Sequence, residues 1–352
     1  FSDHEVDVQN ISIIQSHQIH FGSGHWIHRN QTEEEVEWDL RYQHCAINII
    51  GHRHACPTEK VFRTRQWHWE GSSGFPSLVR PPDNSSSSSS SHLLNSRLNG
   101  KLIAFWGDSL TLQFYVGFVC SFYAAGAMVE KERDAPSKIE ITRIYWISNR
   151  GPVITLRAAS VICPFLLLNK AGGHTFDPAY DTVCAEMVQL LNHTHQVTHL
   201  VANSGFWYRG NATSFGITSA LRALERFYLT HPTMPPPHFF WRGLTSKHYF
   251  EVNWHIANQS GCDRFLKPSF ELHPSRFQDY VWVKERNELT LGILANVSED
   301  GVFKRMDYLD VQHFDQFRGD AHMGGRDCTH YCGPAVPSLW VQWLLQILFP
   351  TL

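Results

Sequence analysis

The chain has 352 residues, of which 43% are hydrophobic and 18% are charged, and its formal net charge is −3 with histidine neutral. This composition is typical of a globular protein with a sizeable core, and it excludes general disorder. The small net charge gives no reason to expect a nucleic-acid partner.

Cysteines and glycosylation sequons together indicate an oxidising compartment. None of the eight cysteines lies in a Cys-x-x-Cys pair, which argues against a zinc ribbon or a thioredoxin-like site. Chance produces some Asn-x-Ser/Thr sequons in a chain of this length, but seven of them with eight cysteines favour the Golgi lumen or the extracellular space, with N-glycosylation. The sequons begin at Asn10, Asn30, Asn84, Asn192, Asn211, Asn258 and Asn296. The chain starts at Phe1 without a signal peptide, so we expect a mature lumenal part, with any membrane anchor outside this sequence.

The chain divides into two regions of different pattern. Residues 1–95 are rich in histidine, tryptophan and polar residues, and they include seven consecutive serines at 85–91, a feature typical of a surface loop or linker. For residues 1–95 we expect a minor lobe of loops and short strands, packed on the core. Residues 96–352 are expected to form the main domain.

From residue 101 onward, predicted strands alternate with predicted helices. The predicted strands are 102–106, 139–146, 153–156, 198–202 and 238–241. The predicted helices are 110–129, 180–192, 214–229 and 336–348. We interpret the first of these helices, the most apolar stretch, as a buried helix and not as a membrane span. The alternation predicts an α/β fold with a doubly wound parallel sheet and helices on both faces.

Ser109 is the candidate nucleophile. It follows the predicted strand 102–106 in the turn Gly107-Asp108-Ser109, and ligands of such sheets bind beyond the carboxyl ends of the strands. A serine at the start of a helix presents its hydroxyl beside main-chain N–H groups that can hold an oxyanion, provided that a base takes its proton. The alternative is a serine that caps the helix.

The candidate base lies near the end of the chain, in the segment that contains Asp327 and His330. Three residues apart on one turn, the two side chains can meet, so that the carboxylate orients the imidazole. Asp320 and His322 form a second candidate pair that spacing does not exclude. Cys328 and Cys332 flank His330, and disulfides there would make it rigid, which favours the pair of Asp327 and His330.

These motifs, in this order, resemble the SGNH (GDSL-type) hydrolase superfamily, and within it the PC-esterase branch that includes the plant trichome-birefringence-like polysaccharide O-acetyltransferases. Four segments carry the resemblance, which covers about residues 45–350. They are the strand and turn at 98–110, Val-Ala-Asn-Ser-Gly-Phe-Trp at 201–207, the block from Phe240 through Ser246-Lys247-His248 to Cys262, and Asp-Cys-Thr-His-Tyr-Cys at 327–332. The last segment is the most specific of the four.

The resemblance implies an SGNH-like three-layer α/β/α catalytic domain over 96–352, and a role for individual residues. Ser109 would be the nucleophile, His330 the general base and acid, and Asp327 its orienting partner. The side-chain amide of Asn203 would hold the oxyanion together with the main-chain N–H of Ser109. For Asn203 a strand-end turn remains the alternative.

Three further residues would bind substrate by the same resemblance. Trp207 would stack on a sugar, with core packing as the alternative. Arg242 and His248 match family positions, with a structural ion pair or a loop anchor as the alternative. The chain departs from the plant proteins where Leu112-Gln113 replaces an Arg-Asn pair and Lys247 replaces a proline, and these differences leave the substrate and the donor open.

The resemblance also implies three disulfides, whereas eight cysteines alone allow about 105 complete connectivities. The implied pairs are Cys45–Cys120, Cys56–Cys332 and Cys262–Cys328, which leaves Cys163 and Cys184 to pair with each other or to stay free. The histidine pairs His52/His54 and His193/His195 have no third and fourth ligand at suitable spacing, so we expect no metal site.

The resulting hypothesis is a carbohydrate O-acetyltransferase that forms an acyl-serine intermediate. We expect no bound cofactor, an acetyl donor (acetyl-CoA or another acetyl ester) as co-substrate, a glycan or polysaccharide as acceptor, and a monomer. An acetyl esterase of the same fold is an alternative, because the triad is the same and only exclusion of water from the acceptor pocket differs. A non-catalytic lumenal glycan-binding protein is the other alternative.

Overall fold

The computed structural model of the protein describes thirteen separate stretches of the chain. The described residues are 24–51, 56–71, 98, 100–134, 139–145, 152–159, 197–203, 212–248, 262, 277–298, 302, 306–324 and 327–348. The helix predicted at 180–192, the serine run at 85–91, Trp207, Cys163 and Cys184 therefore lie outside the described residues.

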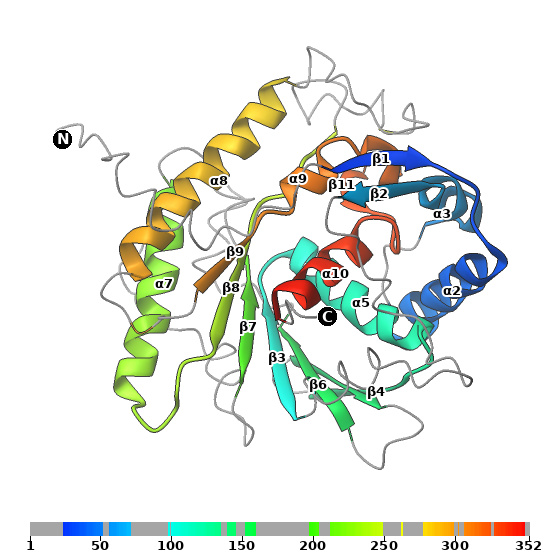
Figure 1. The fold of residues 1–352 in the computed structure, drawn as a ribbon. Helices are drawn as coiled ribbons and strands as arrows, with labels where there is room; N and C mark the ends of the chain where they lie inside the picture. The colour runs from blue at the N-terminus through cyan, green and yellow to red at the C-terminus, as the bar shows by residue number, and fades with distance from the viewer. Residues whose placement is uncertain are drawn as a thin grey trace.

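A seven-stranded sheet forms the centre of the molecule, in the order β4-β5-β6-β3-β7-β8-β9 (Figure 1). The strands are β3 (Lys101–Trp106), β4 (Met128–Asp134), β5 (Ile139–Tyr145), β6 (Pro152–Ala159), β7 (His199–Ala202), β8 (His238–Arg242) and β9 (Met306–Leu309). β3 pairs in parallel with β6 on one side and β7 on the other, and β7, β8 and β9 continue the parallel run. The fold is therefore α/β with a parallel sheet at its centre.

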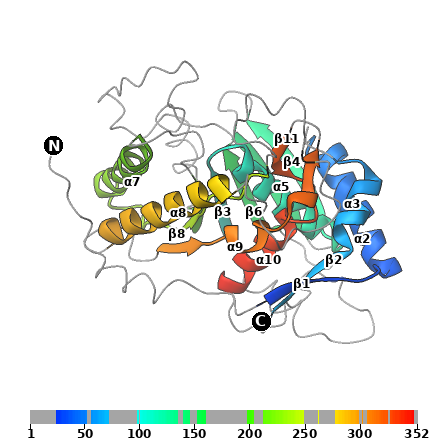
Figure 2. The same cartoon turned by 90° about the horizontal axis from the view of Figure 1, so that it is seen from above.

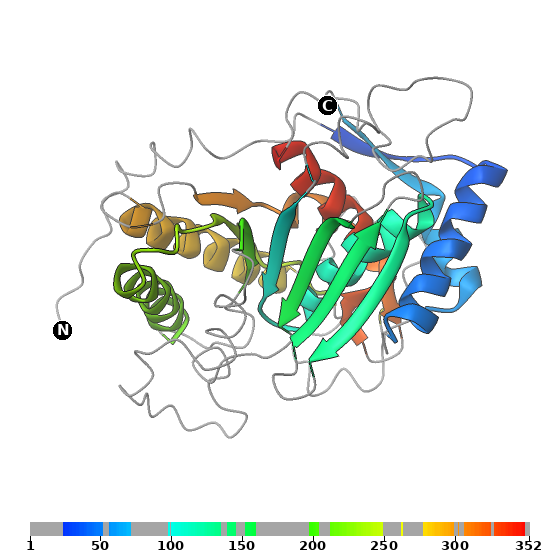
Figure 3. The same cartoon turned by 90° about the horizontal axis from the view of Figure 1, so that it is seen from below.

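One edge of the sheet differs from the prediction of a purely parallel arrangement. β4 pairs with β5, and β5 with β6, in antiparallel register, and the strands of this edge lie side by side in Figure 3. The links between them, 135–138 and 146–151, are too short for the crossover that a parallel pair needs, so the chain reverses at each. The sheet is therefore mixed.

Helices cover both faces of the sheet (Figure 1). The helices that follow the strands are α5 (Ser109–Ala124), α7 (Ala212–Thr230), α8 (Phe277–Ser298), the single turn α9 (Gln312–Asp315) and α10 (Pro337–Leu348). Alternate residues of β3 point to opposite sides: Ile103 and Phe105 pack in the apolar cluster that includes α5 and α10. The other cluster contains Leu102, Ala104, Trp106 and residues of α7 and α8. Both faces of β3 are apolar because both are covered.

The N-terminal part contains the short strands that were predicted, but it also contains helices that were not. Its elements are β1 (Gly24–His28), α2 (Glu33–His44), which continues as a π-helical turn (Cys45–Ile49), α3 (Thr58–Arg65) and β2 (Trp67–Gly71), which pairs antiparallel with β1. Thr32 and Glu35 form a capping box at the start of α2, in which each side chain bonds the other residue's main-chain N–H. This sequence signal favours a helix.

The N-terminal elements lie on the side of α5 away from α7 (Figure 2). Tyr42 and Ala46 belong to the same buried cluster as α5, and the disulfide Cys45–Cys120 joins the two helical segments. A second disulfide, Cys56–Cys332, ties the N-terminal part to the C-terminal part of the chain. The division at residue 95 stays a prediction. Within the described part of the chain, no helix is long and apolar enough to cross a membrane.

Candidate active site

The turn after β3 places Ser109 at the start of α5 without using its hydroxyl as a cap. Asp108 is the N-cap residue, and its carboxylate accepts hydrogen bonds from the N–H groups of Leu110 (3.0 Å) and Thr111 (3.2 Å). The carbonyl of Asp108 accepts the N–H of Leu112. The N–H groups of Leu110, Thr111 and Leu112 are therefore all bound to Asp108. In the first turn of α5, only the N–H of Ser109 has no acceptor among the described residues.

Gly107 allows the ends of β3 and β7 to approach each other at this turn. Its φ is 154°, and a Cβ at this position would lie 2.7 Å from the carbonyl oxygen of Asn203 and 2.5 Å from Oγ1 of Thr111. The first of these contacts is with main chain, which cannot rotate away, so the turn requires glycine. The N–H of Asn203 in turn donates to the carbonyl of Trp106 at 3.1 Å. Asn203 is therefore held directly beside the turn that carries Ser109.

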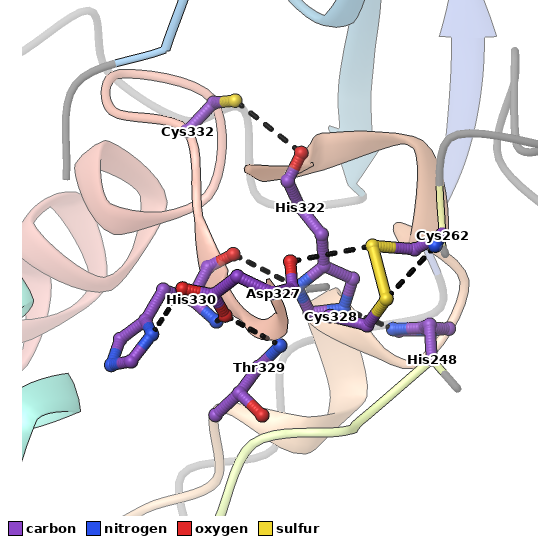
Figure 4. Close-up of a disulfide and its surroundings, with 8 residues drawn as sticks. All are labelled: His248, Cys262, His322, Asp327, Cys328, Thr329, His330 and Cys332. Carbon is purple, nitrogen blue, oxygen red and sulfur yellow. Dashed lines mark hydrogen bonds and ion pairs between the residues drawn. A yellow bond between two sulfur atoms is a disulfide. The ribbon is translucent and has the colours of Figure 1, made fainter. Parts of the chain in front are cut away.

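A continuous hydrogen-bonded chain connects Asp327, His330 and Ser109. Nε2 of His330 lies 2.8 Å from Oγ of Ser109, and Nδ1 of His330 lies 2.8 Å from Oδ2 of Asp327. The other carboxylate oxygen of Asp327 accepts the N–H groups of Thr329 (3.1 Å) and His330 (3.0 Å), as Figure 4 shows. With Nδ1–H donated to the carboxylate, Nε2 is the acceptor that faces the serine hydroxyl.

The carboxylate of Asp327 is ionised at neutral pH. Burial opposes its charge, but the hydrogen bonds from the side chain and main chain of His330 outweigh burial and lower the pKa to about 2. An ionised partner at Nδ1 stabilises the imidazolium that forms when His330 takes a proton. The arrangement can therefore activate a serine hydroxyl and return the proton to a leaving group.

A short antiparallel ribbon carries both Asp327 and His330. It consists of β10 (His322–Gly324) and β11 (Asp327–Tyr331), and it follows a 3-10 turn at Gly319–Ala321. The disulfide Cys262–Cys328, drawn in Figure 4, and the disulfide Cys56–Cys332 hold the ribbon on both sides of His330. These and Cys45–Cys120 are the three pairs that the resemblance implied.

The second candidate pair, Asp320 and His322, does not form. Both oxygens of Asp320 bind the guanidinium of Arg318, at 2.9 and 3.0 Å, with both side chains buried. His322 is buried against the ring of Tyr331 and contacts His248. Burial, together with the neighbouring His248, holds the pKa of His322 well below its usual value, so His322 is neutral at physiological pH.

Comparisons with known proteins give two curated relatives of one kind. No protein-family model matches the chain. One curated relative, "Protein trichome birefringence-like 12" of Arabidopsis thaliana, is 28% identical over 129 residues, which are 32% of this chain and 30% of that protein. Another, "Protein trichome birefringence-like 38" of the same plant, is 23% identical over 274 residues, which are 72% of this chain and 67% of that protein. This chain is similar to the trichome birefringence-like proteins.

The resemblance also implied roles for residues near Ser109, Asp327 and His330. Asn203 is buried at the end of β7, and its side-chain N–H donates to the carbonyl of Arg242 at 2.6 Å. A primary amide carries a second N–H. The role of Asn203 toward an oxyanion stays a prediction.

Arg242 and His248 were expected to bind substrate from the resemblance alone, and the structure gives both of them partners inside the protein. Arg242 is fully buried, forms an ion pair with Asp108 (3.5 Å) and lies over the ring of Trp340. Burial lowers the pKa of Arg242, and Asp108 opposes that shift. Nε2 of His248 lies 2.9 Å from the carbonyl of Gln316. These contacts favour the structural alternative over direct binding of substrate, since neither side chain is open to solvent.

Sequence reasoning missed two residues that support the site. Asp108 was quoted only as part of the Gly-Asp-Ser motif, although an aspartate before a helix is a recognisable cap signal. Gln113 appeared only as a difference from the plant trichome birefringence-like proteins. In the structure its amide bonds the main chain of Tyr331, beside His330.

Proposed function

We propose that this protein is a carbohydrate O-acetyltransferase that acts through an acetyl-Ser109 intermediate, on an SGNH-hydrolase-like fold. The observation that carries the proposal is the chain of two 2.8 Å hydrogen bonds from Asp327 through His330 to Ser109. The similarity to trichome birefringence-like proteins supports the general type of reaction, which is transfer or hydrolysis of an acetyl ester of a carbohydrate. Ser109 lies beyond the carboxyl end of β3, which is paired with β6 on one side and β7 on the other. Ligands of parallel sheets bind at such a position.

In the first half of the reaction, Ser109 becomes acetylated. Oγ of Ser109 attacks the carbonyl carbon of the acetyl donor while Nε2 of His330 accepts the hydroxyl proton. The main-chain N–H of Ser109 and the amide of Asn203 donate to the oxyanion of the tetrahedral intermediate. The intermediate collapses, the bond to the donor's leaving group breaks, and His330 gives its proton to that group.

In the second half, a hydroxyl of the glycan takes the acetyl group. His330 accepts the proton of this hydroxyl as its oxygen attacks the carbonyl of acetyl-Ser109, and the proton then returns to Oγ of Ser109. Water in place of the sugar hydroxyl would make the same site an esterase. The resemblance favours transfer over hydrolysis.

Compartment and partners belong to the same proposal. Disulfides persist in the secretory lumen and outside the cell, and three are present among the described residues. Asn30 and Asn296, which begin two of the sequons, are exposed. We therefore place the protein in the Golgi lumen or the extracellular space, N-glycosylated, with a glycan acceptor and an acetyl donor as its partners.

The proposal is tested by following an acetyl ester in the presence and absence of glycan acceptors. The purified protein is incubated with 4-nitrophenyl acetate, and both nitrophenol release and acetylation of added polysaccharides are measured for wild type and Ser109→Ala. Acetylated glycan that depends on Ser109 supports a transferase. Turnover that depends on Ser109 but yields only free acetate would replace it with an esterase. Equal behaviour of wild type and Ser109→Ala in both measurements would refute serine catalysis and favour a glycan-binding protein.

A further inference from the structure

The side chain of Gln113 forms a two-point connection with the main chain next to the proposed base. Nε2 of Gln113 donates to the carbonyl of Tyr331 at 2.9 Å, and the N–H of Tyr331 donates to Oε1 of Gln113 at 3.1 Å. The side chain of Gln113 is buried. The NH₂ group and the carbonyl oxygen of the Gln113 amide thus both bond the main chain of Tyr331, as a residue of a paired β-strand would.

This connection links the two elements that must meet for catalysis. Gln113 follows Ser109 by four residues on α5, so the two side chains lie on the same face of the helix, one turn apart. Tyr331 follows His330 directly on β11. The two hydrogen bonds therefore join the helix that carries the nucleophile to the strand that carries the base.

Other contacts hold the main chain of His330 from different directions. The carbonyl of His330 lies 3.0 Å from Nδ1 of His322, and the N–H of His330 donates to Asp327. Both of these partners belong to the β10–β11 ribbon itself. They fix the shape of the ribbon but do not tie it to α5. Gln113 provides that tie with an uncharged group, so it adds no net charge beside the imidazole.

We propose that Gln113 is a positioning residue that sets the separation of His330 from Ser109. This inference rests on the proposed function. A displacement of about 1 Å between reacting groups lowers a rate on the order of 100-fold, so two hydrogen bonds that prevent such a displacement affect kcat more than stability alone predicts. The competing explanation is that Gln113 only satisfies buried main-chain groups, in which case its loss would lower stability and leave the chemistry of folded protein unchanged.

The test uses a fluorophosphonate reporter, which needs no knowledge of the natural substrate. Oγ of Ser109 attacks phosphorus, the P–O bond forms, fluoride leaves as the P–F bond breaks, and His330 takes the hydroxyl proton. The rate constant of labelling is measured for wild type, Gln113→Met, which keeps the length of the side chain but forms neither bond, and Val119→Ala. Val119 is buried on the same helix and belongs to its apolar cluster, so Val119→Ala controls for general loss of stability. Melting temperatures of all three proteins are recorded.

We expect Gln113→Met to be labelled on the order of 10- to 100-fold more slowly than wild type at a temperature where it is fully folded, and Val119→Ala to be labelled at the wild-type rate. Equal rates for wild type and Gln113→Met would overturn the inference, as would an equal loss in Gln113→Met and Val119→Ala at matched melting temperatures. If wild type itself is not labelled, the proposed function fails, and that result is distinct from either of these.

A second variant keeps the inference testable if Gln113→Met does not fold. Gln113→Glu retains the side-chain shape and, when protonated, forms both bonds, because a carboxylic acid has one donor and one acceptor. Its labelling rate relative to wild type should fall as pH rises and the carboxyl group ionises. A ratio that stays constant with pH would contradict the positioning role.

Discussion

Replacing Asp327 with asparagine changes one atom of the proposed triad and leaves its shape intact. Oδ1 of the asparagine can still accept the N–H groups of Thr329 and His330, which bind Asp327 now. Its NH₂ group would face Nδ1 of His330, which must then accept a hydrogen bond. The ring proton would move to Nε2, toward Ser109, so that His330 could no longer take the serine proton.

The size of the expected effect follows from the structure. The pKa of Asp327 is lowered from 3.8 to about 2, which at about 1.4 kcal/mol per unit is an upper bound of about 2.5 kcal/mol. Solvent screening at this partly exposed carboxylate reduces the stabilisation of the ionised form to about 1–2 kcal/mol. Because the pKa is lower in the folded protein, this stabilisation is present above about pH 4 and is lost as pH falls from about 4 to about 2. The tautomer change adds a kinetic loss of about 10⁴-fold in acylation.

The assay combines fluorophosphonate labelling of Ser109 with urea denaturation at pH 7 and near pH 2. Asp327→Asn should be labelled about 10⁴-fold more slowly, and its deficit in free energy of unfolding should shrink as pH falls. Asp320→Asn is the matched control, since Asp320 is a buried acid in the same segment that binds Arg318 instead of a histidine. It should lose stability but, where folded, keep the wild-type labelling rate. If Asp327→Asn is labelled as fast as wild type, or both variants are slowed equally, the reasoning is refuted.

Three further substitutions test the surroundings of the site. Gly107→Ala should lower the free energy of unfolding by about 2 kcal/mol or more and slow labelling of Ser109, because its Cβ would overlap the carbonyl of Asn203; an unchanged melting temperature and rate would show that the turn has more room than the structure gives it. The double variant Cys262→Ser/Cys328→Ser opens a link between residues 66 apart and should lose up to about 4 kcal/mol in denaturant titrations on the chain-entropy account. Unaltered stability would mean that this disulfide does not constrain the unfolded chain. Thr32→Ala removes the capping box of α2 and should cost about 1 kcal/mol by thermal unfolding without changing the labelling rate, whereas a slowed rate would mean that α2 affects the site.

Much of the sheet could be predicted because strands buried on both faces consist of uninterrupted apolar residues. The apolar runs that became β3 and β7 are buried on both faces, so no alternation interrupts them. Strand direction could not be predicted in the same way. The apolar pattern of β5 and β6 indicates strands, but their antiparallel pairing follows from the length of the links between them.

The N-terminal helices show how a true signal was overlooked. Thr32 and Glu35 have the spacing of a capping box, and Glu33 and Glu34 place acidic groups in the first turn, where the helix dipole favours them. The histidine and tryptophan content of residues 1–95 suggested loops instead. Composition described the region as a whole, whereas the helix start depended on four residues.

The site could be predicted only as far as local motifs reach. Ser109 follows a predicted strand, and Asp327 and His330 lie three residues apart. The nucleophile and the acid–histidine pair could therefore each be predicted from a short segment of sequence. The pairing of Gln113 with Tyr331 joins residues 218 positions apart, and nothing near Gln113 indicates its partner. Likewise, the resemblance at residues 240–262 assigned Arg242 to the site but could not distinguish a buried arginine from one that faces substrate.

The most direct test of serine catalysis identifies the residue that carries the acetyl group during turnover. Wild-type protein is mixed with 4-nitrophenyl acetate, quenched in acid within the first turnovers, digested and mapped by mass spectrometry, with Ser109→Ala and His330→Ala treated in parallel. We predict acetylation of the peptide at Ser109 in wild type, none at that position in Ser109→Ala, and strongly reduced acetylation in His330→Ala. Turnover with no acetyl group on Ser109, or undiminished turnover by Ser109→Ala, would contradict the account.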